Sequence, residues 1–369
     1  MPVQQTNDYR LAQKILTHSV RPQTGENIMI QLVGLNGINL VRELVKITRE
    51  MKANPFLQIQ DTEIQRELLE TGDQDFWENQ ANVEQKPLME KMQAFVGIRA
   101  SENIYESADV SEEANKAFAE KLLHPVHFEQ RVKHTKWCIL RYPSPAFAMN
   151  AKMSTKAFSD FFYQSCLLDY DRLREAMKPL EKRLRNGKII QLKGKGTDIH
   201  LSVEGQDWVP CFGDRNLPDG ELFSSPLLNS VNGEITYAPS VYQGKPFEFV
   251  YLKVKDGVVT DFDSSNNAAL EAILNTDKGA RRFGEFSFGT NPVISQPMYD
   301  ILFDEKIYGS NHLTLGQDYD EAPNGNKSNI HWDLVCIGAD VYIDDELVRE
   351  GRNFVPNDLK PLNPSHHEK

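Results

Sequence analysis

The side chains best suited to binding metal ions are concentrated in the last two-fifths of this 369-residue chain. They are two glutamates, two histidines, a tyrosine and an aspartate: Glu221, Glu285, His312, Tyr319, His331 and Asp333. Nitrogen and oxygen ligands of these types suit Zn²⁺, Co²⁺ or Mn²⁺. The set is about the number of ligands that two ions need rather than one. It therefore predicts a hydrolase.

The sharpest short motif is His331-Trp332-Asp333. The run 330–337 predicts a strand, so the side chains of His331 and Asp333 should project from the same face. Burying two polar groups in an otherwise apolar segment is costly unless a partner satisfies them. A metal ion is one such partner, and a hydrogen-bonded His–Asp pair without metal is the alternative.

The other four candidates are weaker when each is taken alone. Glu221 follows a turn, and Glu285 lies among glycines and aromatic residues, where Gly284 lets another group come close. For both glutamates, simple exposure to solvent is the alternative. His312 and Tyr319 lie near turn glycines, and a single histidine or tyrosine is usually structural. Three charged residues near His312 in the sequence are expected on the surface: Asp304, Glu305 and Lys306. The co-occurrence of the candidates in one region favours a shared site.

Composition narrows the class of protein. A net charge of −12 argues against a nucleic-acid or anionic-membrane surface. No window approaches the apolar length of a membrane span, and the amino terminus lacks a signal-peptide pattern, so we expect a cytoplasmic protein. The cysteines are widely spaced and lie among apolar neighbours, so we expect them reduced and buried: Cys138, Cys166, Cys211 and Cys336.

The length of the chain predicts two domains. In the first half, strand patterns alternate with helical spacing, as in 28–33, 40–51 and 56–59, which is the βαβ order of a parallel sheet. A long helical stretch follows over 154–185. After Asn186-Gly187, short β-branched and aromatic runs alternate with turn residues.

We therefore predict an α/β fold with two parts. An N-terminal parallel-sheet α/β domain should cover residues 1–188. A β-rich α+β catalytic domain should follow over residues 189–369 and carry all six candidate ligands.

At the candidate residues the chain resembles the aminopeptidase T / aminopeptidase S family, the thermophilic-type metallo-aminopeptidases. The motifs that carry the resemblance are Asn216-Leu-Pro-Asp-Gly-Glu221, Gly284-Glu285 with Gly289-Thr-Asn-Pro292, Gly309-Ser-Asn-His312 with Tyr319, and Ser328-Asn-Ile-His331-Trp-Asp333. The resemblance implies a two-domain exopeptidase with a cocatalytic metal pair, usually dimeric. Matched by position, the residues that would hold metal are Glu221, Glu285, His312, His331 and Asp333, with Tyr319 beside or bound to the ions.

Together with these residues, the resemblance implies hydrolysis of an N-terminal peptide bond by a water activated at two divalent ions (Zn²⁺, Co²⁺, Mn²⁺ or Mg²⁺). Glu285 is the preferred carboxylate for moving the proton, with Glu221 as the alternative, and Tyr319 would stabilise the oxyanion. The expected partners are peptides with a free N-terminus and a second copy of the chain, without nucleic acid or membrane. The alternatives are another two-metal amidase or phosphoesterase, or a protein that binds metal without turnover.

Overall fold

The computed structural model describes residues 5–367, which form two compact units. The first unit comprises the chain up to Leu167 together with Gly213–Leu217, and the second comprises Leu168–Phe212 and the chain from Pro218 onward. Residues 1–4 lie outside the described residues. They begin the amino-terminal segment in which the sequence shows no signal-peptide pattern. The domain boundary at residue 188 stays a prediction, because compact units need not coincide with domains that fold alone.

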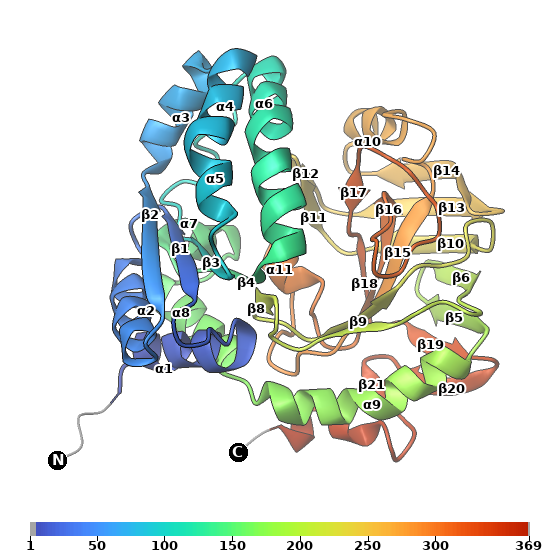
Figure 1. Ribbon diagram of the computed structural model, residues 1–369. Helices are drawn as coiled ribbons and strands as arrows, with labels where there is room; N and C mark the ends of the chain where they lie inside the picture. Colours follow the sequence, from blue (N-terminus) through green and yellow to red (C-terminus); the bar gives the residue numbers. More distant parts are fainter. Residues whose placement is uncertain (1–4, 368–369) are drawn as a thin grey trace. The chain divides into compact units, whose positions relative to one another are not determined.

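The first unit contains a five-stranded parallel sheet in the order β2-β1-β3-β4-β8 (Figure 1). Its strands are β1 (Asn27–Val33), β2 (Asn54–Gln60), β3 (Ala94–Arg99), β4 (Lys136–Arg141) and β8 (Asn216–Leu217). The side chains of alternate residues in β1 point to opposite faces of the sheet. Met29 therefore belongs to an apolar cluster on one face, while Ile28 and Ile30 are buried on the other face.

Helical segments supply the buried partners of this sheet. The cluster around Met29 and Phe95 is closed by side chains from α3 (Thr62–Thr71), α4 (Gln74–Gln80), η2 (Ala81–Gln85), α5 (Lys86–Met89), α6 (Glu112–Phe118) and η3 (Ala119–Val132). The remaining helical segments of the unit are α1 (Asn7–Lys14), η1 (Ile15–Ser19), α2 (Ile38–Glu50), α7 (Pro145–Asn150) and α8 (Thr155–Cys166). Most α-helices here begin at a serine, threonine or aspartate whose side chain caps a backbone N–H: Thr6, Asp61, Asp73, Ser111, Ser144 and Ser154.

The single helix predicted over 154–185 is instead two helices. α8 ends at Cys166, and α9 (Tyr170–Asn186) starts afresh in the second unit. Asp169 separates the two helices, because its side chain accepts a hydrogen bond from the backbone N–H of Arg172 and so caps the start of α9.

The second unit contains two antiparallel sheets and a two-stranded ribbon. The eight-stranded sheet has the order β14 (Val258–Ser264), β13 (Val250–Lys255), β10 (Asn232–Tyr237), β6 (Thr197–Ser202), β5 (Ile189–Gly194), β19 (Asp340–Ile343), β20 (Glu346–Glu350) and β21 (Asn353–Phe354). The six-stranded sheet has the order β17 (His331–Trp332), β16 (Ser310–Gly316), β15 (Phe283–Gly289), β9 (Glu221–Ser224) and β7 (Val209–Cys211), with β18 (Val335–Ile337) also paired to β16. The ribbon is β11 (Ser240–Tyr242) with β12 (Lys245–Phe247), and the helical segments are α9, α10 (Asn267–Leu274), α11 (Ile301–Asp304), η4 (Lys360–Leu362) and η5 (Pro364–His366).

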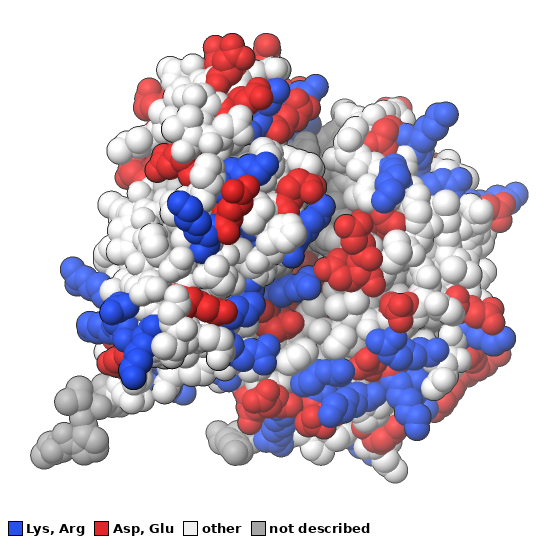
Figure 2. Space-filling view, viewed as in Figure 1, with Lys and Arg blue, Asp and Glu red and all other residues white. Residues whose placement is uncertain are grey.

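The predicted fold class is confirmed: a parallel-sheet α/β region precedes a β-rich region. Within residues 5–367, no helix has both the length and the apolar character that crossing a membrane would require. On the face shown in Figure 2, acidic and basic side chains are interspersed rather than gathered by sign.

Candidate metal centre

Strands of the six-stranded sheet bring the candidate residues to one face. Glu285 lies in β15, and residue alternation puts its side chain opposite those of Phe286 and Phe288, which pack against each other and against Trp208. His312 in β16 pairs in register with Ser287, two residues beyond Glu285. Packing of the aromatic side chains on one face therefore holds β15 in position, and the polar side chains project from the opposite face of the sheet.

Neighbouring strands complete this polar face. Glu221 is the first residue of β9 and pairs with Gly289 of β15, while His331 begins β17 and pairs with Gly316 of β16. Glu221 and Glu285 are only 6% and 3% exposed, so neither is an ordinary surface carboxylate. The exposure alternative for the two glutamates is wrong.

Glu285 lies in the middle of the candidate ligands. One carboxylate oxygen is 3.1 Å from Nε2 of His312, and the other is 3.4 Å from Nε2 of His331. Nε2 of His312 is also 3.7 Å from a carboxylate oxygen of Glu221, and Nε2 of His331 is 3.2 Å from Oδ1 of Asp333. Two groups of ligand atoms result, Glu221/Glu285/His312 and Glu285/His331/Asp333, each with all its atoms within 4.8 Å of one another.

The strand predicted over 330–337 is interrupted between Trp332 and Val335, because β17 and β18 pair with different parts of β16. Asp333 lies in this interruption and still faces His331. Its Oδ1 accepts a 2.6 Å hydrogen bond from the hydroxyl of Thr314.

The histidines show how well the residues fit a cation. Nδ1 of His331 lies 2.8 Å from the backbone carbonyl of Gln317, to which it can donate, and this leaves Nε2 facing the carboxylates. Within residues 5–367, that buried Nε2 has no aligned hydrogen-bond partner, although two carboxylates lie within 3.5 Å. A divalent ion would satisfy the nitrogen and the carboxylates together.

Tyr319 lies at the edge of the cluster. Its ring centroid is 4.6 Å from that of His331 and 5.7 Å from that of Phe223, and the residue is 44% exposed. The structure therefore brings Tyr319 beside the ligands, and its service as a ligand or as an oxyanion donor stays a prediction.

The expectation that Asp304, Glu305 and Lys306 lie on the surface is wrong. Lys306 is fully buried, and its Nζ forms ion pairs with Glu305 and with Glu221, the latter at 2.5 Å, while Asp219 lies 3.8 Å away. A signal was present in the sequence, since Lys306 stands among the apolar residues Phe303 and Ile307, both of which are buried. Asp304 is buried for another reason, because it accepts a hydrogen bond from the backbone N–H of Met298.

The cysteine predictions are confirmed in part. Within the described chain all four cysteines are free of disulfides, and three are buried, while Cys211 is half-buried. No sequence motif indicates that Cys211 lies close to Asp219 and Glu221, with ligand-type atoms within 4.8 Å of one another.

Neighbouring charges and burial shift the pKa values of the ionisable groups in opposite directions. Burial alone would raise the pKa of Glu285, but the neighbouring imidazoles of His312 and His331 hold it below its usual value. Burial alone would lower the pKa of His312, but Glu285 and nearby carboxylates raise it to about 9. Without a cation, these histidines hold protons that a metal ion must displace.

Glu305 differs from Glu285 in the direction of its pKa shift. Burial raises its pKa to about 8, although the charge of Lys306 acts in the opposite direction. It belongs to neither of the two ligand groups. A carboxyl group whose pKa lies near neutrality can both accept and release a proton.

A small cavity of about 120 Å³ opens beside His331 and Asp333. Its walls include Tyr242 and Trp332, whose rings stack with centroids 4.9 Å apart, and the apolar Ile301. Two larger cavities, of about 740 Å³ and about 680 Å³, are lined by other residues.

Comparison with known proteins supports the same chemistry. A family model described as thermophilic metalloprotease (M29) matches residues 4–353. Aminopeptidase T of Thermus aquaticus is 29% identical over 198 residues, which are 46% of this chain and 47% of that protein. Aminopeptidase 2 of Geobacillus stearothermophilus is 34% identical over 157 residues, 37% of each protein. The matched segments thus span about half or less of these curated relatives.

A solved structure shares the fold over nearly the whole chain. Wild-type AmpT from Thermus thermophilus superposes with a TM-score of 0.80 at 19% identity, covering 95% of this chain and 99% of that one.

Proposed function

The chain belongs to the thermophilic metalloprotease family (M29), and from this membership we propose that it is a metal-dependent aminopeptidase that removes the N-terminal residue of peptides. The observation that carries the proposal is the position of Glu285, which offers one carboxylate oxygen to each of two ligand groups. A shared carboxylate between two sets of nitrogen and oxygen ligands is the arrangement that a pair of divalent ions requires.

In this proposal Glu221, Glu285 and His312 hold one ion, and Glu285, His331 and Asp333 hold the other. Bound divalent ions supply Lewis acidity, which polarises a carbonyl and can lower the pKa of water to about 7. Ligands of these types accept Zn²⁺, Co²⁺ and Mn²⁺, so the identity of the metal is left to experiment.

The proton must be moved by a carboxylate that is not fully committed to metal. Glu285 and Glu221 were the candidates from the sequence, but both oxygens of Glu285 face histidines and Glu221 is paired to Lys306. These contacts favour both as ligands. Glu305 also pairs with Lys306 but belongs to neither ligand group, so it becomes the preferred group to accept a proton from the attacking water and return it to the leaving amine.

A tyrosine and a small cavity would complete the site. Tyr319, beside His331, would donate a hydrogen bond to the oxyanion. The cavity lined by Tyr242 and Trp332 would receive the side chain of the N-terminal residue, which favours apolar side chains at that position.

The experiment compares leucine p-nitroanilide with its N-acetylated form on the metal-loaded protein. An aminopeptidase needs the free amine, so we expect cleavage of the first and at least about 100-fold slower cleavage of the second. Equal cleavage of both would point instead to a general amidase. Hydrolysis of p-nitrophenyl phosphate without cleavage of either anilide would favour a phosphoesterase, and metal binding without any turnover would leave a non-catalytic metal protein.

A further inference from the structure

The first unit contains a cavity of about 680 Å³ near the carboxyl ends of three parallel strands. Val33 ends β1, Gln60 ends β2 and Arg99 ends β3, and all three residues line it. They also lie side by side in register, since Val33 pairs with both Gln60 and Arg99.

This is the part of a doubly wound sheet where ligands bind most often. The strand order β2-β1-β3 reverses direction at β1, and open α/β sheets bind ligands at such a reversal, beyond the carboxyl ends of the strands. None of the six candidate metal ligands contributes to this cavity, because all belong to the second unit.

The walls combine apolar and amide groups. Phe76 of α4, Phe118 of α6 and Leu122 of η3 contribute apolar surface. Five glutamines also line the cavity: Gln31, Gln60, Gln65, Gln80 and Gln85. Gln31 is 3% exposed and donates from Nε2 to Gln58 at 2.7 Å, but its Oε1 has no hydrogen-bond partner in the described chain. This buried acceptor, set among apolar walls, marks a built site rather than a packing gap.

Arg99 supplies a cationic group that nothing in the described chain neutralises. Its Nη1 is buried and makes no hydrogen bond to any residue of 5–367. Burial, together with the like charges of Arg141 and Arg131, lowers the pKa of Arg99 to about 9. An unpaired guanidinium in such a position is costly unless a partner of opposite charge is bound for at least part of the time.

The other charged groups near this cavity reinforce the need for an anion. Arg131 is 7% exposed, and its Nη1 is likewise unpaired among the described residues. His127 is neutral near pH 7, because burial and the nearby arginines lower its pKa to about 3. Asp61 is the one acidic side chain among the described lining residues, and its Oδ1 already caps α3 by accepting from Glu63 and Ile64.

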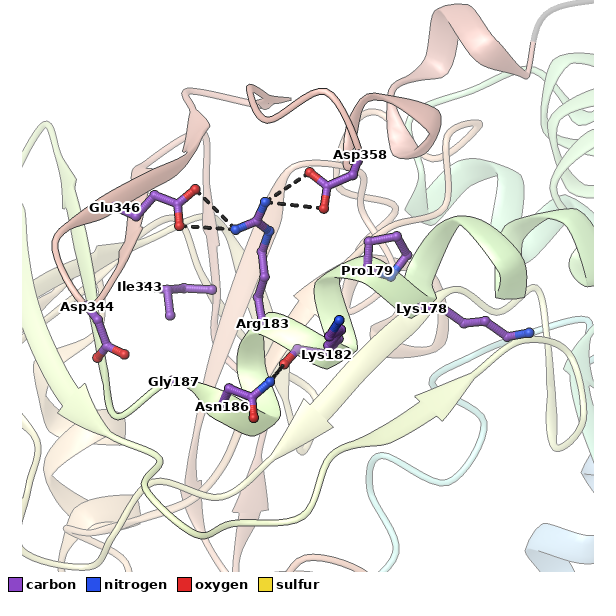
Figure 3. A pocket seen from close by; sticks show the side chains of 10 residues that line it. All are labelled: Lys178, Pro179, Lys182, Arg183, Asn186, Gly187, Ile343, Asp344, Glu346 and Asp358. Atoms are coloured by element: carbon purple, nitrogen blue, oxygen red, sulfur yellow. Dashed lines mark hydrogen bonds and ion pairs between the residues drawn. The ribbon is translucent and has the colours of Figure 1, made fainter.

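A cavity of the second unit contains an arginine whose charge is balanced by carboxylates of the chain. In that cavity, of about 740 Å³, both terminal nitrogens of Arg183 bind carboxylates, Nη1 to Glu346 and Nη2 to Asp358 (Figure 3). Arg183 needs no further anion, whereas Arg99 does.

We propose that the cavity at the ends of β1, β2 and β3 binds a small organic monocarboxylate, with Arg99 holding the carboxylate and the apolar walls holding its hydrocarbon body. A planar guanidinium matches a carboxylate by two parallel hydrogen bonds. A single arginine balances one negative charge, while a phosphate would call for further donors.

The test measures equilibrium binding by calorimetry on the full-length, metal-loaded protein. Phenylacetate is the probe, phenylacetamide is its neutral counterpart and phenyl phosphate is the competing anion. The variants are Arg99→Gln and, as a matched control, Arg42→Gln, which removes an exposed arginine from α2 of the same unit. We expect phenylacetate to bind the wild type and Arg42→Gln equally, and to bind Arg99→Gln about tenfold or more weakly, because a charge-assisted hydrogen bond is lost.

Several outcomes would overturn the proposal. They are no binding of phenylacetate at millimolar concentration, equal binding to wild type and Arg99→Gln (as binding at the metal centre would give), or tighter binding of phenylacetamide or phenyl phosphate than of phenylacetate. Thermal unfolding adds an independent readout. Arg99→Gln without ligand should melt no lower than the wild type, since it removes an unpaired buried charge, and a melting temperature several degrees lower would show that Arg99 is structural instead.

Discussion

Glu285 presents its two carboxylate oxygens to different histidines, at 3.1 Å to His312 and at 3.4 Å to His331. The substitution Glu285→Gln keeps the size of the side chain but replaces one oxygen by an NH₂ group, which cannot bind a cation. We expect kcat/KM to fall by about 100-fold or more with the fold retained, because a ligand shared by both groups is lost. Steady-state kinetics with circular dichroism checks this, and Glu271→Gln, at an exposed position of α10, is the control. Full turnover by Glu285→Gln would exclude Glu285 both as an essential ligand and as the base.

Lys306 neutralises buried carboxylates that would otherwise repel one another. The substitution Lys306→Met leaves Glu221, Glu305 and Asp219 without this cation, so we expect the metal-free protein to lose about 3 kcal/mol of unfolding free energy. Urea denaturation measures the change. Lys327→Met is the matched control, because Lys327 pairs with Asp318 at 3.2 Å but is 72% exposed, and its removal should cost under about 1 kcal/mol. Equal effects of the two substitutions would contradict this role of Lys306.

The sequence revealed ligand types but not their surroundings. Glu221, Glu285, His312, His331 and Asp333 could be selected because their side chains bind metal and their motifs resemble a known family. Lys306 and Glu305 were predicted to lie on the surface because charged residues are usually exposed. Only the tertiary structure shows that the two side chains form an ion pair with each other below the surface.

At the scale of elements, η3 contains two histidines in contrasting surroundings. His127 is neutral in the folded protein because burial, Arg131 and Arg99 lower its pKa to about 3, whereas an unfolded chain protonates it below about 6.5. Between these values the unfolded state binds the extra proton, so the contribution of His127 to stability falls as pH falls. The predicted loss is about 1 kcal/mol per pH unit.

Urea midpoints of wild type and His127→Gln between pH 7.5 and pH 5 test this dependence. The variant should lose less stability than the wild type on acidification, while groups common to both proteins cancel in the comparison. His124→Gln is the control, since the side chain of His124 is 63% exposed. A pH dependence identical in wild type and His127→Gln would refute the prediction.

Helices and strands were predicted correctly where the spacing of apolar residues is regular. They were missed where a helix cap, or a change of the strand with which a segment pairs, interrupts that spacing. The strand–helix–strand alternation of the first unit follows from apolar spacing, and the need for Gly284 is confirmed, because a Cβ there would lie 2.3 Å from the backbone oxygen of Gln317. The breaks at Asp169 and Asp333 were not predicted. Both depend on where a single side chain or strand finds its partner, and residue periodicity does not record this.

At the scale of the whole molecule, removal of metal separates a catalytic from a structural role. The apolar cores of both units are built from residues other than the candidate ligands, so the protein treated with a chelator should remain folded while aminopeptidase activity disappears. Activity should return with Zn²⁺, Co²⁺ or Mn²⁺. Circular dichroism and anilide hydrolysis on the same samples check both parts. Unfolding on chelation would show a structural metal, and turnover by demonstrably metal-free protein would end the proposed mechanism.

The return of the chain to the first unit at Gly213–Leu217 limits how this protein can be divided. Strand β8 pairs with β4 through Asn216 and Leu217, and only four residues later the chain supplies Glu221. A single crossover between genes could therefore not exchange one unit for a homologous unit. The reason is that strand β8 of the first sheet is encoded between two segments that encode the second unit. The scaffold and the chemistry are inherited as one block, and an engineer who wished to transplant either would have to make three joins, one of them close to the candidate metal ligand Glu221.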